Sequence, residues 1–265
     1  FAFFSPREAV IVAFGPDLEY QFAPRYNIAP SQDVTLLRLD EDGELRTDNY
    51  RWGLVPFGAK DPAIGNGRIN ERAETDRQDY LDHLDQADGI FITGGNQLRL
   101  STILGGTEVA KKIRRMNAKG VHIAGTSAGA AIMPEHMIAG GDAGAMPSGD
   151  GINLAPGLGL TNALLIDQHF SQRHRLGRLL TAISYNPFML GIGIDEDTAI
   201  FIDPEHSFEV VGSGAVTVIA PVHLIYSSMS KASKKDALSM LDSKLHILSK
   251  GCTFDIVARK PYPPK

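Results

Sequence analysis

Apolar residues form short uninterrupted blocks from about residue 76 onward, and stretches with helical spacing separate them. Short apolar runs that end at glycine or at a polar residue are typical of strands buried in a sheet. Such runs predict strands at 89–93, 120–124, 164–166 and 191–194. Helices are predicted between them, at 76–87, 107–118 and 173–184. Alternating strands and helices favour an α/β fold with a mostly parallel sheet flanked by helices, of the flavodoxin-like or class I amidotransferase-like type.

The two ends of the chain depart from this pattern. Apolar blocks at 199–202, 208–211 and 216–219 predict three later strands, for which antiparallel pairing is one interpretation. The first 75 residues carry many aromatic residues, prolines and turn signals, with short β-like runs such as 34–38. We therefore expect an atypical β-rich N-terminal segment, residues 1–75, followed by the α/β domain, residues 76–265.

Polar side chains follow the predicted strands of the α/β domain. The polar stretches are 93–97, 125–130, 166–170 and 194–197. In open α/β sheets ligands bind outside the carboxyl ends of the strands. We therefore expect the functional residues to come from these four stretches.

The turn around Ser127 has a spacing that is typical of a nucleophile. Ser127 lies between a predicted strand and a predicted helix, with Gly125 two residues before it and Gly129 two residues after it. This G-x-S-x-G pattern lets the chain turn sharply enough to expose the hydroxyl, with helix N-terminal amides nearby to bind an oxyanion. An ordinary turn rich in glycine and serine gives the same pattern, so other residues have to decide between the two interpretations.

A serine nucleophile needs a base and an acid that orients the base. Of the eight histidines, His169 is the best candidate for the base, because it directly follows a predicted strand; a structural histidine is the alternative interpretation. Asp195 and Glu196 are both candidates for the acid, and as neighbours they should face different ways in an extended chain. Gly94 and Gly95 permit close backbone approach and are candidates for a second oxyanion N–H.

Three arginines, Arg173, Arg175 and Arg178, lie at the start of the predicted helix 173–184. Positive charge is mildly unfavourable at a helix N-terminus, so a simple solvated face explains the cluster poorly. Guanidinium groups bind carboxylates through paired hydrogen bonds. The cluster therefore predicts the rim of a pocket for substrate carboxylates.

Composition excludes few classes of function. A net charge of −5 gives no basic surface for nucleic acid, and no apolar run reaches the length of a membrane span. A single cysteine, Cys252, fits a reducing compartment such as the cytoplasm. No phosphate-binding, dinucleotide or metal-binding pattern is visible, so no cofactor and no metal are expected. The chain begins with Phe1 rather than methionine, so we expect the natural start, and any leader, to lie upstream.

Four motifs together resemble those of cyanophycinases, from about residue 67 to the end of the chain. The matching stretches are 91–100, 125–130, 167–178 and 191–196. The resemblance implies a serine-type exopeptidase that hydrolyses cyanophycin, a poly-aspartate with arginine on each side-chain carboxyl, to β-aspartyl-arginine dipeptides. It also implies an acyl-enzyme, a homodimer and no need for a cofactor. A dipeptidase of the same fold that acts on Asp-containing peptides is the alternative within this class.

The resemblance assigns roles to individual residues. Ser127 would be the nucleophile, His169 the base and Glu196 the orienting acid, with Gly95 and Ala128 giving oxyanion amides. The residues that it implies for substrate binding are Gln97, Asp167, Gln168, Arg173, Arg175 and Arg178. Family members usually have aspartate where this chain has Asn96, which removes a negative charge near the expected pocket.

The N-terminal segment instead resembles the start of an SRAP domain, a family that crosslinks to abasic DNA. The matching stretches are 1–5, 26–32, 51–56 and 69–75. The nucleophilic cysteine of that family is absent, and of its site only Asn70 and Arg72 are present. The chain therefore looks like a fusion of two fragments joined at about residues 67–76. A DNA-associated SRAP-like fragment is the alternative function from a different class.

Overall fold

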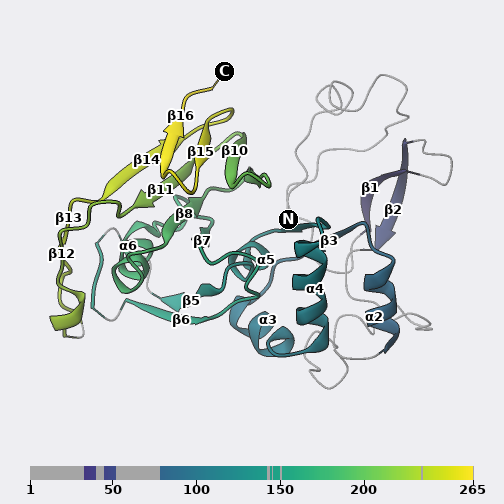
Figure 1. Ribbon diagram of the computed structural model, residues 1–265, viewed down its shortest axis with the longest axis horizontal. Helices are drawn as coiled ribbons and strands as arrows, with labels where there is room; N and C mark the ends of the chain where they lie inside the picture. The colour runs from purple at the N-terminus through teal and green to yellow at the C-terminus, as the bar shows by residue number, and fades with distance from the viewer. Residues whose placement is uncertain are drawn as a thin grey trace. The chain divides into compact units, whose positions relative to one another are not determined.

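The computed structural model describes residues 33–39, 45–51, 78–141, 144, 146–149, 151–233 and 235–264 (Figure 1). The chain forms two compact units, Phe1–Glu71 and Arg72–Lys265. In the first unit β1 (Asp33–Leu39) pairs antiparallel with β2 (Leu45–Arg51). Apart from Arg51, the stretches that resemble SRAP domains lie outside the described residues, as do Asn70 and Arg72.

The second unit is built around a four-stranded sheet in the order β14-β11-β8-β7. Two of its strands, β7 (Leu164–Gln168) and β8 (Leu190–Ile194), run parallel and are buried along their whole length. The helix α6 (Leu176–Tyr185) connects them, as a parallel pair requires. The other two strands, β11 (Val216–Ala220) and β14 (Lys244–Leu248), pair antiparallel to their neighbours.

A second parallel pair precedes this sheet in the sequence. Its strands are β3 (Gly89–Ile92) and β4 (His122–Gly125), and the crossover between them holds α3 (Gln97–Leu104) and α4 (Glu108–Ala118). The helix α2 (Gln78–Asp85) comes before β3, and the short α5 (Ala128–Ala131) follows β4. On α4, the buried residues Ala110, Ile113 and Met116 form an apolar face with helical spacing.

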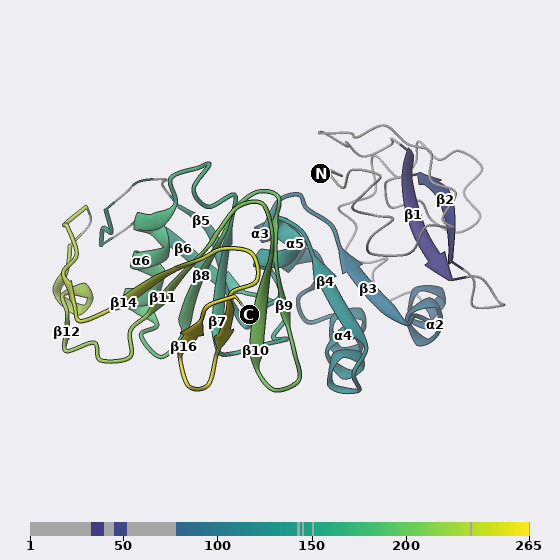
Figure 2. The same cartoon turned by 90° about the horizontal axis from the view of Figure 1, so that it is seen from above.

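The remaining strands form small antiparallel sheets (Figure 2). One sheet has the order β16-β15-β10-β9 and is centred on the stacked rings of Phe208 and Phe254. Its strands are β9 (Thr198–Ile202), β10 (Ser207–Gly212), β15 (Thr253–Asp255) and β16 (Lys260–Tyr262). Two further pairs are β5 (His136–Gly141) with β6 (Ile152–Pro156), and β12 (Tyr226–Ser227) with β13 (Met240–Leu241). The 3-10 helix η3 (Met229–Lys231) lies between β12 and β13 in the sequence.

The expected α/β fold is present, but the expectation of a mostly parallel sheet is wrong for the described residues. There, two strand pairs are parallel, β3 with β4 and β7 with β8, and the other named pairs are antiparallel. The reason is the length of the later connections, because residues 203–206 alone join β9 to β10. A parallel pair needs a crossover of about a dozen residues, so such a short link reverses the chain.

No helix in the described ranges is both long and apolar enough to cross a membrane.

Candidate active site

Ser127 sits on a sharp turn between β4 and α5. Its φ of 53° and ψ of −118° put a non-glycine residue in an unfavourable region of backbone space. A Cβ atom on Gly125 would lie 2.5 Å from the carbonyl oxygen of Gly129, and one on Gly129 would lie 2.1 Å from that of Ile92. Both glycines are therefore required by close backbone approach, which is the packing expected of the strand–turn–helix around an exposed serine.

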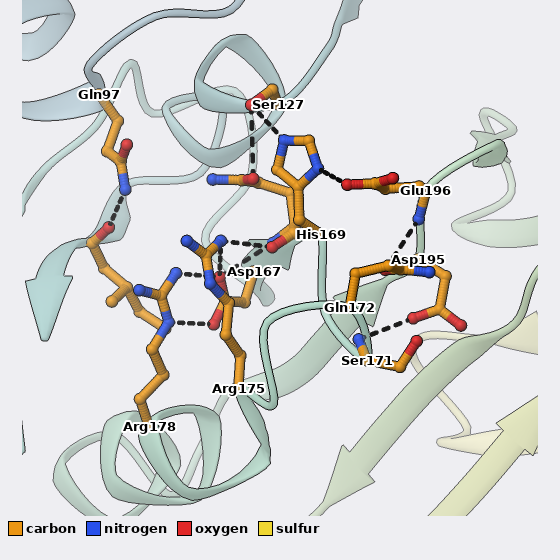
Figure 3. A network of polar contacts seen from close by, with 12 residues as sticks. Gln97, Ser127, Asp167, His169, Ser171, Gln172, Arg175, Arg178, Asp195 and Glu196 are labelled. Carbon is orange, nitrogen blue, oxygen red and sulfur yellow. Dashed lines mark hydrogen bonds and ion pairs between the residues drawn. The ribbon is translucent and has the colours of Figure 1, made fainter. Parts of the chain in front are cut away.

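The imidazole of His169 lies between Ser127 and Glu196 (Figure 3). Its Nε2 is 2.9 Å from the Ser127 Oγ, and its Nδ1 is 2.7 Å from Oε1 of Glu196. His169 follows the last residue of β7, and Glu196 belongs to the turn after β8. In the tautomer that satisfies both contacts, the serine hydroxyl donates to Nε2 and the Nδ1–H donates to the carboxylate. This is the geometry that activates a serine for attack on a carbonyl.

The structure separates the two candidates for the orienting acid. Glu196 contacts His169, whereas the carboxylate of Asp195 accepts hydrogen bonds from the backbone amides of Ser171 at 2.9 Å and Ala215 at 3.3 Å. Gln172 adds a second link, because its Oε1 accepts a hydrogen bond from the Glu196 amide at 3.2 Å. The loop after β7 is thus tied to the loop after β8 by two hydrogen bonds besides the imidazole–carboxylate contact. Sequence reasoning missed Gln172, and no motif marks it.

The residues considered for oxyanion binding lie around the serine. A Cβ on Gly94 would come 3.3 Å from the Ser127 Cβ, so the turn after β3 passes directly beside the serine. Gly95 has a φ of 135°, which L side chains rarely adopt. Ala128 is buried and begins α5. Backbone amides from two different turns therefore lie close to the serine.

Two polar residues after β3 have partners within the protein. Asn96 is the N-cap of α3, and its side-chain oxygen accepts from the Arg99 amide at 2.9 Å. Asparagine and aspartate serve equally well at such a cap, so the unusual residue at this position keeps a structural role. The amide nitrogen of Gln97 donates to the carbonyl oxygen of Ile138 at 3.0 Å.

A cluster of charged side chains lies beneath the end of β7. Asp167, Arg175 and Arg178 are 1 %, 8 % and 5 % exposed, and they contact one another (Figure 3). Arg178 binds the Asp167 carboxylate with two groups, Nε at 2.5 Å and Nη2, while Arg175 Nη1 lies 3.4 Å from it. Arg175 also donates to the carbonyl oxygen of Gln168. Two guanidinium groups against one carboxylate leave one positive charge in excess.

Burial lowers the pKa of Arg175 to about 10, with the positive charge of Arg178 as the next contribution, while the carboxylate of Asp167 raises it. Arg175 therefore stays protonated at neutral pH.

Two other residues implied for substrate binding contact Ser127 and His169. Gln168 Oε1 lies 3.4 Å from the Ser127 Oγ, and the backbone amide of Arg173 donates to the His169 carbonyl oxygen at 3.1 Å. A hydroxyl has one hydrogen, so Ser127 can donate to only one of the two acceptors. The closer acceptor is Nε2 of His169.

In the described residues, no group of three or more histidine, cysteine, aspartate or glutamate side chains is arranged to hold a metal ion.

Comparison with known proteins matches the two parts of the chain to two different families. The sequence model of peptidase family S51 matches residues 69–210, and that of the SOS response associated peptidase (SRAP) family matches residues 1–82. A cyanophycinase of Trichormus variabilis is 37 % identical over 228 residues, which are 79 % of this chain and 76 % of that protein. A cyanophycinase of Geminocystis herdmanii is 39 % identical over 218 residues, 82 % and 78 % of the two chains.

The first residues match a different group of proteins. An abasic site processing protein of Bacillus subtilis is 40 % identical over 78 residues, which are 28 % of this chain and 34 % of that protein. Both resemblances seen in the sequence are thereby confirmed. Among solved structures, a peptidase from an acI-B1 Actinobacterium superposes with a TM-score of 0.48 at 20 % identity and covers 66 % of each chain.

Proposed function

Because the chain belongs to peptidase family S51, we propose that it is a serine-type exopeptidase that hydrolyses cyanophycin and releases β-aspartyl-arginine dipeptides. The observation that supports this most directly is the line of contacts from Ser127 through His169 to Glu196, at 2.9 and 2.7 Å. The two relatives named above that match about four fifths of this chain, at 37 % and 39 % identity, are cyanophycinases. Family and geometry thus point to the same chemistry.

The proposed reaction begins with attack of the Ser127 Oγ on the carbonyl carbon of the scissile peptide bond. His169 takes the hydroxyl proton through Nε2 and passes it to the leaving amine, so that an acyl-enzyme forms and the dipeptide product or the shortened chain leaves. A water molecule then attacks the ester, His169 takes its proton, and the serine is regenerated. Glu196 holds the imidazole in the required tautomer and stabilises its positive charge during both steps.

The amides of Ala128 and Gly95 are the proposed donors to the oxyanion. Ala128 directly follows the serine, which is the usual place for one donor in a strand–turn–helix site. The second donor comes from the turn after β3, which Gly94 brings against Ser127. Fixed backbone donors of this kind stabilise the negative charge that develops on the carbonyl oxygen.

Substrate recognition is proposed to rest on the excess positive charge beneath β7. Each branch of cyanophycin carries a free carboxylate, and Arg175, which stays charged in its buried site, is the proposed partner for it. Gln168, Gln97 and Arg173 are the proposed polar contacts closer to the surface. The proposal includes a homodimer and a cytoplasmic location.

The test is release of soluble β-aspartyl-arginine from insoluble cyanophycin by the full chain and by Ser127→Ala. We expect release by the parent and none by the variant, a fall of at least about 10⁴-fold, because the nucleophile is removed. Ser249→Ala, an exposed serine outside the site, is the matched control and should release dipeptide at the parental rate. Release by Ser127→Ala would rule out Ser127 as the nucleophile, and cleavage of Asp-containing dipeptides alone would favour a dipeptidase.

A further inference from the structure

The carboxylate of Asp167 is buried and surrounded by donors from the protein itself. Its oxygens accept from Arg178 Nε at 2.5 Å, from Arg178 Nη2, from Arg175 Nη1 at 3.4 Å and from the Gln168 amide at 2.9 Å. Three of these donors reach Oδ1 and one reaches Oδ2, so both carboxylate oxygens already have partners within the protein. With 1 % of its surface exposed, Asp167 also offers no surface to a guanidinium from outside.

The same cluster fixes the peptide group that precedes the imidazole. The N–H of Gln168 donates to Asp167, and its C=O accepts from Arg175, so both backbone groups of the residue before His169 are held by the cluster. His169 itself has a φ of 47°, a positive value that is uncommon for residues other than glycine. A backbone in that region persists only where its surroundings determine it. Here the charged cluster holds the preceding peptide group, and the Arg173 amide donates to the His169 carbonyl oxygen at 3.1 Å.

We propose that Asp167 and Arg178 are positioning residues that hold the Gln168–His169 backbone, and through it the imidazole, in line with Ser127. This inference rests on the proposed serine-type function, and it separates the buried cluster into two parts. The Asp167–Arg178 pair acts on the geometry of the base alone, whereas Arg175 also holds the Gln168 carbonyl oxygen and carries the charge that is proposed to meet substrate. The motif implies substrate binding for all three residues, but their contacts within the protein assign Asp167 and Arg178 a different role from that of Arg175.

The first experiment measures kcat and KM separately for Asp167→Asn with a short soluble oligomer of β-aspartyl-arginine. This substitution keeps the shape of the side chain but turns an amide N–H toward a guanidinium, so the bidentate contact is lost. We expect kcat to fall by about tenfold to a hundredfold, the effect of a misplaced catalytic group, and KM to stay within about twofold. Arg178→Lys, which has a point charge in place of the fork, should give a smaller fall of the same kind.

The second experiment measures how fast Ser127 is labelled by a small reagent that does not use the peptide-binding sites. A small organophosphate, diisopropyl fluorophosphate, reacts with an activated serine: an Oγ–P bond forms as the P–F bond breaks, fluoride leaves and the base takes the hydroxyl proton. Its rate depends on the alignment of Ser127 and His169 but not on the peptide subsites. We expect the labelling rate of Asp167→Asn to fall by the same factor as kcat. Because labelling needs no cyanophycin, it tests the positioning role even if the chain cleaves another peptide.

A control separates positioning from loss of stability. Val210→Ala removes buried side-chain volume from β10, where Val210 is 0 % exposed, and should lower the melting temperature while leaving the labelling rate unchanged. If Asp167→Asn raises KM but leaves kcat and labelling at parental values, Asp167 contacts substrate and the proposal is wrong. If it lowers only the melting temperature, as Val210→Ala does, the pair supports the fold alone and the proposal is equally overturned.

Discussion

The two parallel strand pairs bring different residues to the same site and are buried to different degrees. Every residue of β7 and β8 is buried, and this pair delivers His169 and the turn with Glu196. In β3 and β4, which deliver the turn with Ser127, exposed positions alternate with more buried ones, and Phe91 is 51 % exposed. Parallel sheets are normally covered on both faces, so β3 and β4 are the less usual pair.

This difference shows how each half of the candidate site, the one on β7 and β8 and the one on β3 and β4, holds its residues in place. Around β7 and β8 the site is held by side chains, namely the charged cluster and the packed ring of Phe170, which is 4 % exposed. Around β3 and β4 the site is held by backbone contact, because Gly125 and Gly129 bring the turn within van der Waals reach of Ile92 and of each other. Backbone cannot repack as side chains do, so changes at the two halves should have unequal effects.

The largest effect is expected from Gly129→Ala, in the half that depends on backbone contact. The new Cβ would lie 2.1 Å from the Ile92 carbonyl oxygen, which is part of β3 and has nowhere to move. We expect about 3 kcal/mol of lost stability and at least about a hundredfold fall in kcat as Ser127 shifts. Thermal unfolding and dipeptide release measure the two effects.

The control for this change is Gly140→Ala on β5, where a Cβ would meet nothing within 4 Å. It should leave both stability and activity close to those of the parent. Parental activity in Gly129→Ala would mean that the turn around Ser127 is not set by its contact with β3.

A smaller effect is expected from Gly193→Ala, in the half held by side chains. There the new Cβ would lie 2.5 Å from the ring of Phe170, which follows His169 in the sequence. A ring can tilt where a strand carbonyl cannot, so we expect about 1–3 kcal/mol of lost stability and a milder fall in kcat than for Gly129→Ala. Guanidinium chloride unfolding and steady-state kinetics provide the measurement. If Gly193→Ala lowers stability and kcat as much as Gly129→Ala does, the two parts of the site do not differ in how rigidly they are held.

The sequence was a good guide to residues whose chemistry depends on local spacing. The glycines around Ser127 mark a turn that only small residues permit, and His169 stands where a buried run ends, so the amino-acid pattern alone places both at strand ends. The strand and helix segments 164–166, 191–194 and 173–184 are likewise predicted by that pattern, and they appear as β7, β8 and α6. In each case the deciding information lies within a few neighbouring residues.

Contacts between distant residues could not be predicted in this way. Asp167 and Arg178 were singled out by motif as substrate contacts, because nothing in a sequence says that a carboxylate at a strand end faces a guanidinium on the next helix. Spacing alone leaves both Asp195 and Glu196 as candidates for the acid, and only the resemblance to cyanophycinases favours Glu196, while Gln172 gives no signal. The direction of the later strands depended on loop length and pairing, which apolar patterning does not report.

The smallest effect is expected at Gln172, which lies in the exposed loop that follows β7. Glu196 is 55 % exposed, and the Gln172 Oε1 at 3.2 Å from its amide is one of two links that hold its turn against the loop of His169. Gln172→Leu removes that hydrogen bond, which is worth about 1 kcal/mol, so we expect roughly a fivefold fall in kcat with KM unchanged.

The neighbouring Ser171→Ala is the control, because the Ser171 contact with Asp195 uses only its backbone amide and survives the change. Steady-state kinetics of the two variants should therefore differ about fivefold in kcat. If Gln172→Leu keeps the parental kcat, the other contacts of the turn, such as those of Asp195 and of Thr198 with the Glu196 carbonyl oxygen, are enough to set the position of Glu196.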